Sequence, residues 1–351
     1  MNKAPINLAI VGLGDVARGH LKVWRKINNA RIAAVCDSNK PRAEETAKAW
    51  GIPAYSDDLG EILRRQPISI VDICTPPQAH CSLVLQALKA GCHAIVEKPL
   101  TMTTEEAKMI ISAQRDSQAK VTVIHSWLYE PVMTRALSLI KKGKLGAILS
   151  VEVKALSTPK SPMLCNQEHW CHSLPGGRLG EMLAHPIYII QAVLGQLKVK
   201  SVQAIKLGSY PWVRFDELRV GLEANKGSAS IYASFNSSRA DVLIDINGTQ
   251  GMLQIDLDSD TLVQLKSRPL TIFSKGMDSL GQVYQMTFST ARGALSKLSG
   301  KWLSGTELCI RAFIDSVLDD KEPLVSLKEA YNTVELLEQL CREIDSQPIN
   351  D

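Results

Sequence analysis

The residues best placed to do chemistry in this 351-residue chain begin with Glu97-Lys98-Pro99, which follows a short apolar run at 92–96. The run predicts a buried strand, and in open α/β sheets ligands bind beyond the carboxyl ends of the strands. A lysine there can meet a substrate and stabilise negative charge on an oxygen atom. Taken alone, the tripeptide more often marks a solvated Glu-Lys pair, so its interpretation depends on the rest of the chain.

A glycine-rich turn, Gly12-Leu13-Gly14-Asp15-Val16-Ala17, directly follows the apolar residues 6–11 and opens a helical stretch. Gly-x-Gly-x-x-Ala between a strand and a helix is a dinucleotide-binding fingerprint. Gly12 would make the tight turn, and Gly14 would let the backbone approach a pyrophosphate. The N–H groups at the helix start, around Asp15 and Val16, would face the phosphates. The motif predicts a dinucleotide site, although Gly-x-Gly turns by themselves are common.

The next predicted strand, 31–36, ends in Asp37. A carboxylate at this position accepts hydrogen bonds from the ribose hydroxyls and repels a 2′-phosphate, which favours NAD over NADP. Lys40 and Arg42 follow Asp37 closely, and their positive charges are compatible with the 2′-phosphate of NADP, so NADP remains an alternative. The alternative role for Asp37 is the N-cap of the following helix, but the glycine turn upstream favours the ribose role.

A stiff loop, Thr75-Pro76-Pro77-Gln78-Ala79-His80, follows the predicted strand 69–74. Its two prolines restrict the backbone, which suits a wall against a flat ligand. Strands alternate with helices up to residue 125, which predicts a parallel sheet covered on both faces. We therefore expect a Rossmann-type doubly wound NAD(P)-binding domain over residues 1–125.

The second half, residues 126–351, has a different pattern. A helix at about 183–194 precedes predicted strands near 199–207, 216–224, 228–236, 241–247 and 250–257, and helices close the chain at 306–319 and 326–345. Turn signals between consecutive strands predict a mostly antiparallel open sheet with helices, an α+β domain. The C-terminal helices could pack back on the first domain. Residues 276–305 have no clear pattern and are compatible with a lid, an oligomer contact or a disordered loop.

Composition narrows the function classes. The net charge of +4 is too small to indicate nucleic-acid binding, which needs a concentrated basic patch. No apolar run approaches the ~20 residues of a membrane span, and the first residues do not have a signal-peptide pattern. The eight cysteines are scattered and include no Cys-x-x-Cys pair, as expected of buried thiols in a reducing compartment. We therefore expect a cytoplasmic protein.

In order and separation, these motifs resemble the Gfo/Idh/MocA family, named after glucose–fructose oxidoreductase, inositol dehydrogenase and a rhizopine-catabolism protein. The resemblance runs nearly end to end. It rests on Gly12-x-Gly14-x-x-Ala17, Thr75-Pro76-Pro77-x-x-His80, Glu97-Lys98-Pro99, Gly176-Gly177 followed by Glu181-x-x-x-His185, and the closing 320–326 segment.

The resemblance implies a first domain that binds NAD or NADP, with the Thr75–His80 loop and Glu97 along the cofactor. It implies that Lys98 and His185 meet a sugar or polyol. It also implies that the Lys98–Pro99 peptide can be cis, the less common X-Pro isomer. The open face of the second domain's sheet would form a contact in a homodimer or homotetramer.

The residue chemistry agrees with that family. Oxidising a secondary alcohol needs a base for the hydroxyl proton, and the imidazole of His185 titrates in the useful range. Lys98 can stabilise the same oxygen. Glu181, four residues before His185, could hold the imidazole. Pro186 favours a helix that begins near Ala184, which would place Glu181 in the approach loop.

The chain departs from the family where relatives border the substrate. It has Glu181 where the family often has Asp, Tyr188 where it often has another acid, and Trp127-Leu128-Tyr129 where it often has an arginine. The substrate itself therefore cannot be assigned by analogy. We expect Tyr129, Trp170, His172, Arg178 and Tyr188 to line the sugar site.

Three alternatives remain to be weighed. His169-x-x-His172 with Cys165, Glu168 and Cys171 could bind zinc, but the usual spaced cysteine pairs are missing, and we predict no metal. Some members of such a family oxidise a sugar transiently to cleave a bond, which would make this chain a lyase or glycosidase. A dinucleotide-binding regulator without catalysis would need neither Lys98 nor His185. The leading hypothesis is an NAD(P)-dependent oxidoreductase of carbohydrates.

Overall fold

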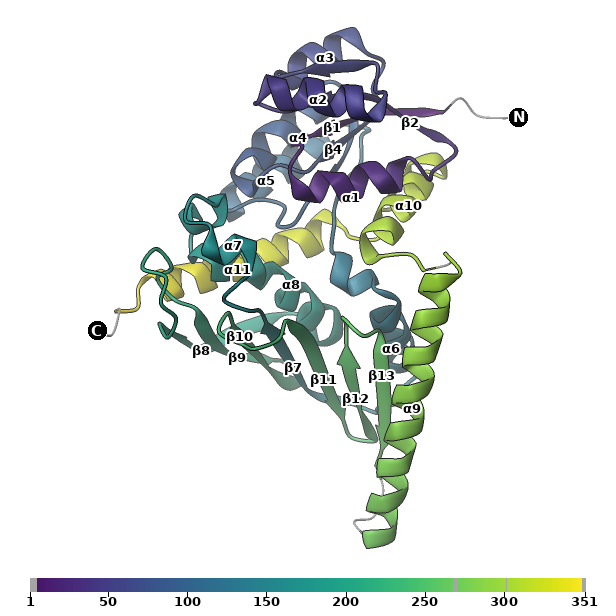
Figure 1. Cartoon of the computed structure of the whole chain (residues 1–351), viewed down its shortest axis with the longest axis vertical. Helices are drawn as coiled ribbons and strands as arrows, with labels where there is room; N and C mark the ends of the chain where they lie inside the picture. The colour runs from purple at the N-terminus through teal and green to yellow at the C-terminus, as the bar shows by residue number, and fades with distance from the viewer. Residues whose placement is uncertain (1–4, 268–270, 301, 349–351) are drawn as a thin grey trace. The chain divides into compact units, whose positions relative to one another are not determined.

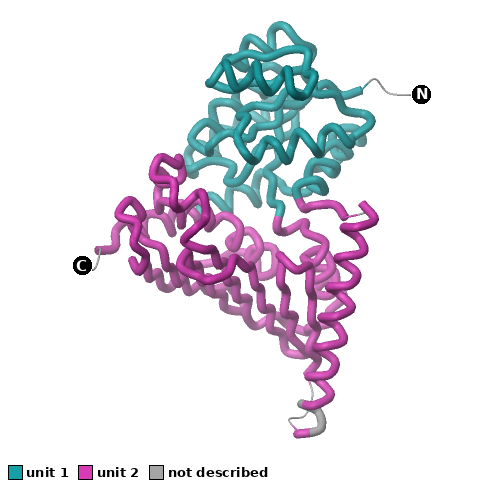
Figure 2. The backbone as a smooth tube through the Cα atoms, in the orientation of Figure 1, with its two compact units in different colours: residues 1–126, 306–335 teal, residues 127–305, 336–351 magenta. Residues whose placement is uncertain are grey.

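The computed structural model describes residues 5–267, 271–300 and 302–348. The chain forms two compact units, one of residues 1–126 with 306–335 and one of residues 127–305 with 336–351 (Figure 2). Within the described ranges, no helix has both the length and the apolar character needed to cross a membrane.

The first unit contains a six-stranded parallel sheet in the order β3-β2-β1-β4-β5-β6 (Figure 1). In this order the first three strands are added on one side of the sheet and the next three on the other, with the switch between β1 and β4, which confirms the predicted doubly wound Rossmann-type fold. The strands are β1 Ile6–Val11, β2 Ala30–Cys36, β3 Ala54–Ser56, β4 Ile70–Ile73, β5 His93–Val96 and β6 Val121–Val123. The helices are α1 Asp15–Trp24, α2 Lys40–Trp50, α3 Leu59–Arg65, α4 His80–Lys89 and α5 Thr104–Arg115.

The two predicted C-terminal helices are present as α10 Gly305–Leu318 and α11 Leu327–Asp345. Residues 306–335 belong to the first unit, where polar side chains of β6 and its approach hold them. Lys120 Nζ donates to the carbonyl oxygens of Ser316 and Lys321, at 2.8 and 2.7 Å. Thr122 Oγ1 donates to the carbonyl oxygen of Val325 at 3.0 Å.

The second unit contains a seven-stranded sheet in the order β13-β12-β11-β7-β10-β9-β8, in which only the β7–β10 pair is parallel. The predicted mostly antiparallel sheet is therefore confirmed. Its strands are β7 Ile148–Leu156, β8 Leu197–Ile205, β9 Glu217–Ala224, β10 Gly227–Ser234, β11 Asp241–Gly248, β12 Gly251–Asp256 and β13 Thr261–Lys266. The last of these strands was not predicted.

The helices of the second unit are α6 Pro131–Lys141, α7 Pro162–Cys165, α8 Gly177–Leu194 and α9 Ile272–Leu298, with 3-10 turns η2 Ser126–Tyr129 and η3 Trp170–Ser173. The segment 276–305, which had no clear pattern, lies largely in α9. The disordered-loop alternative is therefore wrong for the part of the segment that lies in α9. The main core forms where α8 packs its buried apolar side chains against the sheet.

The prediction that α8 begins near Ala184 is wrong. The helix begins at Gly177, after Gly176 in the left-handed region at φ 68°, and Pro186 lies inside it. Pro186 removes one helical hydrogen bond, a cost of about 3 kcal/mol. Burial of most of the 18-residue helix outweighs this cost, because helix stability in proteins comes mainly from tertiary packing.

The start of α8 gives a test of this packing. A Cβ atom on Gly180 would lie 2.1 Å from the Pro175 carbonyl oxygen and 3.0 Å from Cys341 Sγ. We expect Gly180→Ala to lower the free energy of unfolding by about 1–3 kcal/mol, as overpacking does. Urea unfolding measures the change. Gly19→Ala, in α1 with no atom within 4 Å of its Cβ, is the matched control and should be neutral or stabilising by up to ~1 kcal/mol. Equal losses in both variants would contradict the steric explanation.

Candidate active site

The glycine turn of the first unit leaves a helix N-terminus open. Gly12 has a φ of 83°, and a Cβ on it would lie 2.7 Å from the Thr75 backbone nitrogen. α1 follows with Gly14 as its N-cap and no side-chain cap, and a Cβ on Gly14 would meet no atom within 4 Å. Uncapped N–H groups beside open space are what a pyrophosphate requires.

Asp37 is buried at the end of β2, where it fixes this turn. Its Oδ2 accepts a hydrogen bond from the Leu13 backbone N–H at 2.8 Å, and its Oδ1 accepts one from Asn39 N–H at 2.9 Å. The N-cap of α2 is Asn39, whose Oδ1 accepts from Arg42 N–H at 3.1 Å. The N-cap alternative for Asp37 is therefore wrong, and its carboxylate retains lone pairs for a ribose.

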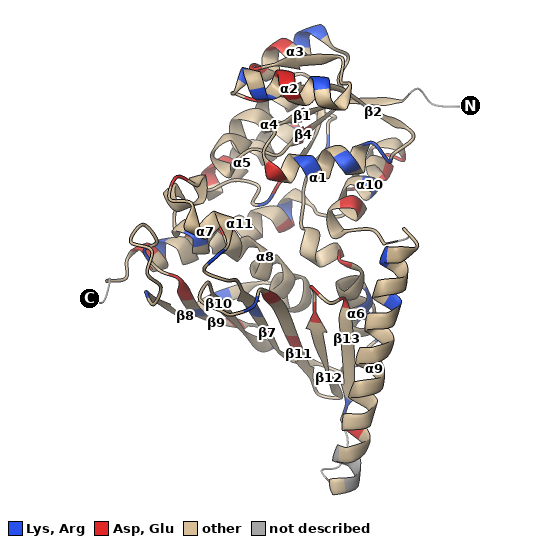
Figure 3. Cartoon of the chain, in the orientation of Figure 1, with Lys and Arg blue, Asp and Glu red and all other residues tan. Residues whose placement is uncertain are grey.

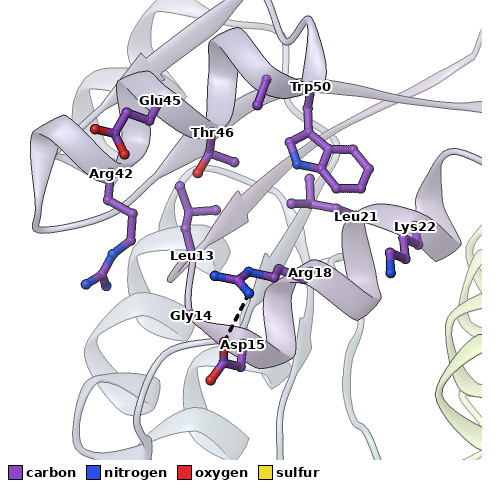
Figure 4. Close-up of a pocket in the computed structure, with 11 residues that line it drawn as sticks. Leu13, Gly14, Asp15, Arg18, Leu21, Lys22, Arg42, Glu45, Thr46 and Trp50 are labelled. Atoms are coloured by element: carbon purple, nitrogen blue, oxygen red, sulfur yellow. Dashed lines mark ion pairs between the residues drawn. The ribbon is translucent and has the colours of Figure 1, made fainter.

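A cavity of about 560 Å³ opens beside Gly14, between α1 and α2. Arg42 reaches it from α2, and Arg18 lies across it on α1, 3.6 Å from Asp15 Oδ1 (Figure 4). Trp50 and Leu21 form its apolar wall. Sequence reasoning missed Arg18 and Trp50, because only their helical positions bring them beside the glycine turn.

The Thr-Pro-Pro loop is joined to the Glu-Lys-Pro segment through His80. This ring is fully buried, with Nδ1 2.8 Å from the Pro99 carbonyl oxygen and Nε2 2.9 Å from that of Thr75. Burial lowers the pKa of His80. Thr75 Oγ1 is buried and has no hydrogen-bond partner among the described residues, so it can serve a bound ligand. The Lys98–Pro99 peptide is cis, as the resemblance implied.

A buried network holds Glu97, next to Lys98. His20 Nε2 lies 3.1 Å from Glu97 Oε1, and its Nδ1 lies 2.8 Å from Asp72 Oδ2. Glu97 Oε2 accepts from the Lys98 backbone N–H at 3.1 Å. Burial, the largest single effect, lowers the pKa of His20, but the charges and hydrogen bonds of Asp72 and Cys74 together raise it well above its usual value. Sequence reasoning missed this network, although a lone aspartate inside the apolar strand β4 was a signal for it.

Two of the possible zinc ligands in residues 165–172 have backbone oxygens as neighbours. Cys171 Sγ is directed to the Met163 carbonyl oxygen, and His172 Nε2 lies 3.1 Å from that of Asn166. Among the described residues, the one group of three possible ligands is His20, Asp72 and Cys74, whose ligand atoms lie within 4.8 Å of one another. These atoms already form the network around Asp72.

In the second unit, His185 on α8 lies among aromatic side chains. Its ring stacks on Trp127, with centroids 4.1 Å apart and planes at 17°. Its Nδ1 shares a 2.7 Å hydrogen bond with Tyr188 Oη, which also accepts from the Trp127 backbone N–H at 3.0 Å. Two positions that depart from the family pattern, Trp127 and Tyr188, therefore fix the imidazole.

Arg178 and Glu181, two turns and one turn before His185 on α8, form an ion pair. Both side chains are nearly buried, and the Arg178 guanidinium lies 4.9 Å from the centre of the Phe235 ring. Glu181 is thus on the helix itself, not in an approach loop, and the prediction about its position is wrong. The cause is the early start of α8 at Gly177.

The remaining predicted substrate residues lie on the two 3-10 turns of this unit. Trp170 and His172 belong to η3, which packs against α8. Burial lowers the pKa of His172. Tyr129 ends η2, the turn that also contains Trp127. The sequence predicted neither these 3-10 turns nor the stacking of Trp127 on His185.

Both halves of the chain match family models. Residues 6–125 match an oxidoreductase family with an NAD-binding Rossmann fold, and residues 138–349 match the C-terminal alpha/beta domain of that oxidoreductase family.

Curated relatives and solved structures are also oxidoreductases, in agreement with the family match. The chain is 31% identical over 211 residues to D-glucoside 3-dehydrogenase of Escherichia coli, covering 58% of each protein. It is 25% identical over 259 residues to inositol 2-dehydrogenase of Rhizobium meliloti, covering 70% of this chain and 74% of that enzyme. It spans less than two thirds of the length of several other curated relatives. The WlbA dehydrogenase from Bordetella pertussis, solved with NADH and UDP-GlcNAcA, has the same fold, with a TM-score of 0.79, 17% identity and complete coverage of both chains.

The buried charge on His20 gives a pH test. Because its pKa is raised in the fold, the charged imidazole stabilises the protein fully below the unfolded value of ~6.5, and this contribution is lost as the pH rises through the folded value. We expect the free energy of unfolding of the natural chain to fall relative to that of His20→Gln as the pH rises above ~6.5. Urea unfolding at stepped pH measures both. A difference that stays constant from pH 6 to 9 would show that His20 is not charged in the fold.

Proposed function

The chain belongs to the Gfo/Idh/MocA oxidoreductase family, and on this premise we propose that it transfers a hydride between a nicotinamide cofactor and a hydroxyl or carbonyl group of a sugar, polyol or related carbohydrate. The observation that carries the proposal is the uncapped start of α1 beside Gly14, with the Asp37 carboxylate at the end of the next strand. The substrate class comes from the relatives, which are named as dehydrogenases of glucosides and inositol. A panel of sugars, polyols and nucleotide sugars, followed by NADH absorbance, tests it.

The residues present fit NAD. The N–H groups at the start of α1, around Asp15 and Val16, would bind the pyrophosphate, and Asp37 would bind the adenosine ribose. Thr75 Oγ1 and the Pro76-Pro77 wall would contact the cofactor beyond it. The bound nicotinamide supplies the hydride acceptor. NADP is the alternative cofactor, because Arg18 and Arg42 line the cavity beside the proposed ribose position and could pair with a 2′-phosphate.

For the reaction, we propose that His185 takes the proton of the substrate hydroxyl group and that Lys98 stabilises the oxygen atom of that group. His185 is fixed at Nδ1 by Tyr188 and on one face by Trp127, so its ring is held in one orientation. A base held in this way can take the hydroxyl proton of a secondary alcohol. Lys98 would donate to the same oxygen as negative charge develops. The Arg178–Glu181 pair, two turns and one turn before His185, would bind further substrate hydroxyls.

We also propose a cytoplasmic location and a homodimer or homotetramer that uses the open face of the second unit's sheet. None of the eight cysteines, all of which lie in the described residues, forms a disulfide, and seven of them are buried, as expected in a reducing compartment.

The cofactor assignment predicts the effect of Asp37→Ala. Removing a charged hydrogen-bond acceptor, worth ~1.5–3 kcal/mol, should weaken NAD binding by about 10- to 100-fold and relax discrimination against NADP. Titration by tryptophan fluorescence measures both cofactors. Asn39→Ala, which removes the α2 cap but no ribose contact, is the control and should keep the NAD preference. Equal binding of both cofactors by the natural chain would defeat the assignment.

The catalytic assignment predicts a pH–rate profile. The rate of alcohol oxidation should rise with pH through one ionisation, and His185→Ala should remove that rise and lower turnover by roughly a hundredfold or more. Lys98→Ala should lose turnover while still binding NAD, and Lys98→Arg should not restore it, because a planar guanidinium cannot replace an ammonium at one oxygen. Tyr188→Phe should keep the fold and shift the ionisation. Near-normal turnover of His185→Ala with an unchanged profile would move the base to Tyr129, Tyr188 or His172.

A further inference from the structure

Helix α9 runs along strand β13, the edge of the second unit's sheet (Figure 1). Gln285 binds the backbone of this edge with both atoms of its amide. Its Oε1 accepts from Gln264 N–H at 2.9 Å, and its Nε2 donates to the Gln264 carbonyl oxygen at 3.1 Å. The side chain thus makes the two hydrogen bonds that a neighbouring strand would make, and α9 covers the sheet edge.

The residues of α9 that are not exposed are small or polar. Among its described side chains they are Asp278, Gly281, Gln282, Gln285, Ser289, Gly293 and Ser296. A surface helix normally turns its apolar face to the core and its polar face to water. In α9 the small and polar face packs against the protein and the large apolar side chains face solvent, so these apolar side chains need a different partner.

Those apolar side chains form one stripe, which we define as Met277, Leu280, Tyr284, Phe288, Ala291, Leu295 and Leu298. The spacings are three or four residues, so the stripe occupies an arc of roughly 80° and runs for about 32 Å along the helix. Leu280, Tyr284 and Leu295 are each about 70% exposed, and Phe288 is 58% exposed. The stripe is continuous over six turns of the helix.

The stripe carries no charge. The stripe contains no Asp, Glu, Lys or Arg, and the charged residues of α9 whose side chains the structure describes, Asp278, Arg292 and Lys297, are not part of it. Most of α9 is tan in Figure 3. Helices that lie on membrane surfaces carry a polar face rich in Lys and Arg. The composition of α9 does not fit that class and favours contact with another apolar protein surface.

The exposed area is sufficient for such a contact. A Leu, Met or Phe side chain offers about 60–120 Å² of apolar surface. The six large apolar side chains of the stripe are exposed by 48–86%, which gives roughly 350 Å² of apolar surface per copy. Two copies would bury about 700 Å² of apolar surface. Because interfaces between identical copies are about 65% apolar, the whole interface would be about 1,100 Å², the lower limit of a specific interface.

We propose that the α9 stripe is an interface with a second copy of this chain, in which the two helices pack stripe against stripe about a twofold axis. A twofold interface needs one self-complementary surface, and an uncharged apolar stripe with three- and four-residue spacing provides it. This contact is separate from the sheet face and from the catalytic proposal, and it goes beyond both.

The test uses the full chain and its mass in solution. Light scattering after size exclusion, at protein concentrations from 1 to about 100 µM, should show an even number of copies for the natural chain. The double variant Tyr284→Asp/Phe288→Asp should have half that mass, with the same circular dichroism. Met286→Asp is the matched control: Met286 is 51% exposed on the same helix but projects away from the stripe, so the mass should not change.

Three results would overturn the proposal: a natural chain that is monomeric at every concentration, a double variant with the mass of the natural chain, or a control that dissociates equally. A natural chain that floats with anionic phosphatidylserine vesicles and loses this binding in the double variant would assign the stripe to a membrane instead. None of these measurements depends on catalysis, so the proposed function can fail while the interface stands.

Discussion

The carboxylate of Asp72 sits in the centre of the first unit with no exposed surface, and much of that unit is arranged to satisfy it. An unpaired charge at such a depth would be very costly, so it needs strong donors. α1 supplies two, His20 Nδ1 at 2.8 Å and Trp24 Nε1 at 2.6 Å, from residues four apart on one helix face. These contacts set the rotation and height of α1 on the sheet, and therefore the place of its N-terminus beside Gly14. His20 then extends the constraint to Glu97, which binds the backbone of Lys98.

The second unit fixes its histidine by a different principle. The ring of His185 stacks on Trp127, and its Nδ1 shares a hydrogen bond with the hydroxyl group of Tyr188. The nearby carboxylate, Glu181, forms an ion pair with Arg178. The imidazole is therefore oriented by an aromatic ring and a neutral hydroxyl group, whereas the first unit uses buried charged groups.

The sequence was sufficient to predict the elements that depend on neighbouring residues in the chain. The Gly12–Ala17 turn, the strand ends at Asp37 and Thr75, and the antiparallel sheet follow from periodicity and turn residues. It was insufficient where the partner is distant: no local pattern pairs His20 with Asp72, 52 residues away. It misled at Pro186, because the propensity against proline is weaker than the packing of α8. It had no pattern for α9, because this helix packs with its polar face inward.

The return of residues 306–335 to the first unit also has a consequence for how the protein is made. β6 emerges from the ribosome early, but the backbone oxygens that Lys120 and Thr122 bind, at Ser316, Lys321 and Val325, are synthesised about 200 residues later. Domains generally fold as units during synthesis, N-terminal first. Here residues 306–335 complete the first unit and residues 336–351 complete the second, so neither unit is complete until the C-terminal helices have been synthesised. A nascent chain stalled before residue 306 would hold all six strands of the Rossmann sheet, but Lys120 and Thr122 would lack these backbone partners, and the β6 side would be exposed to chaperones.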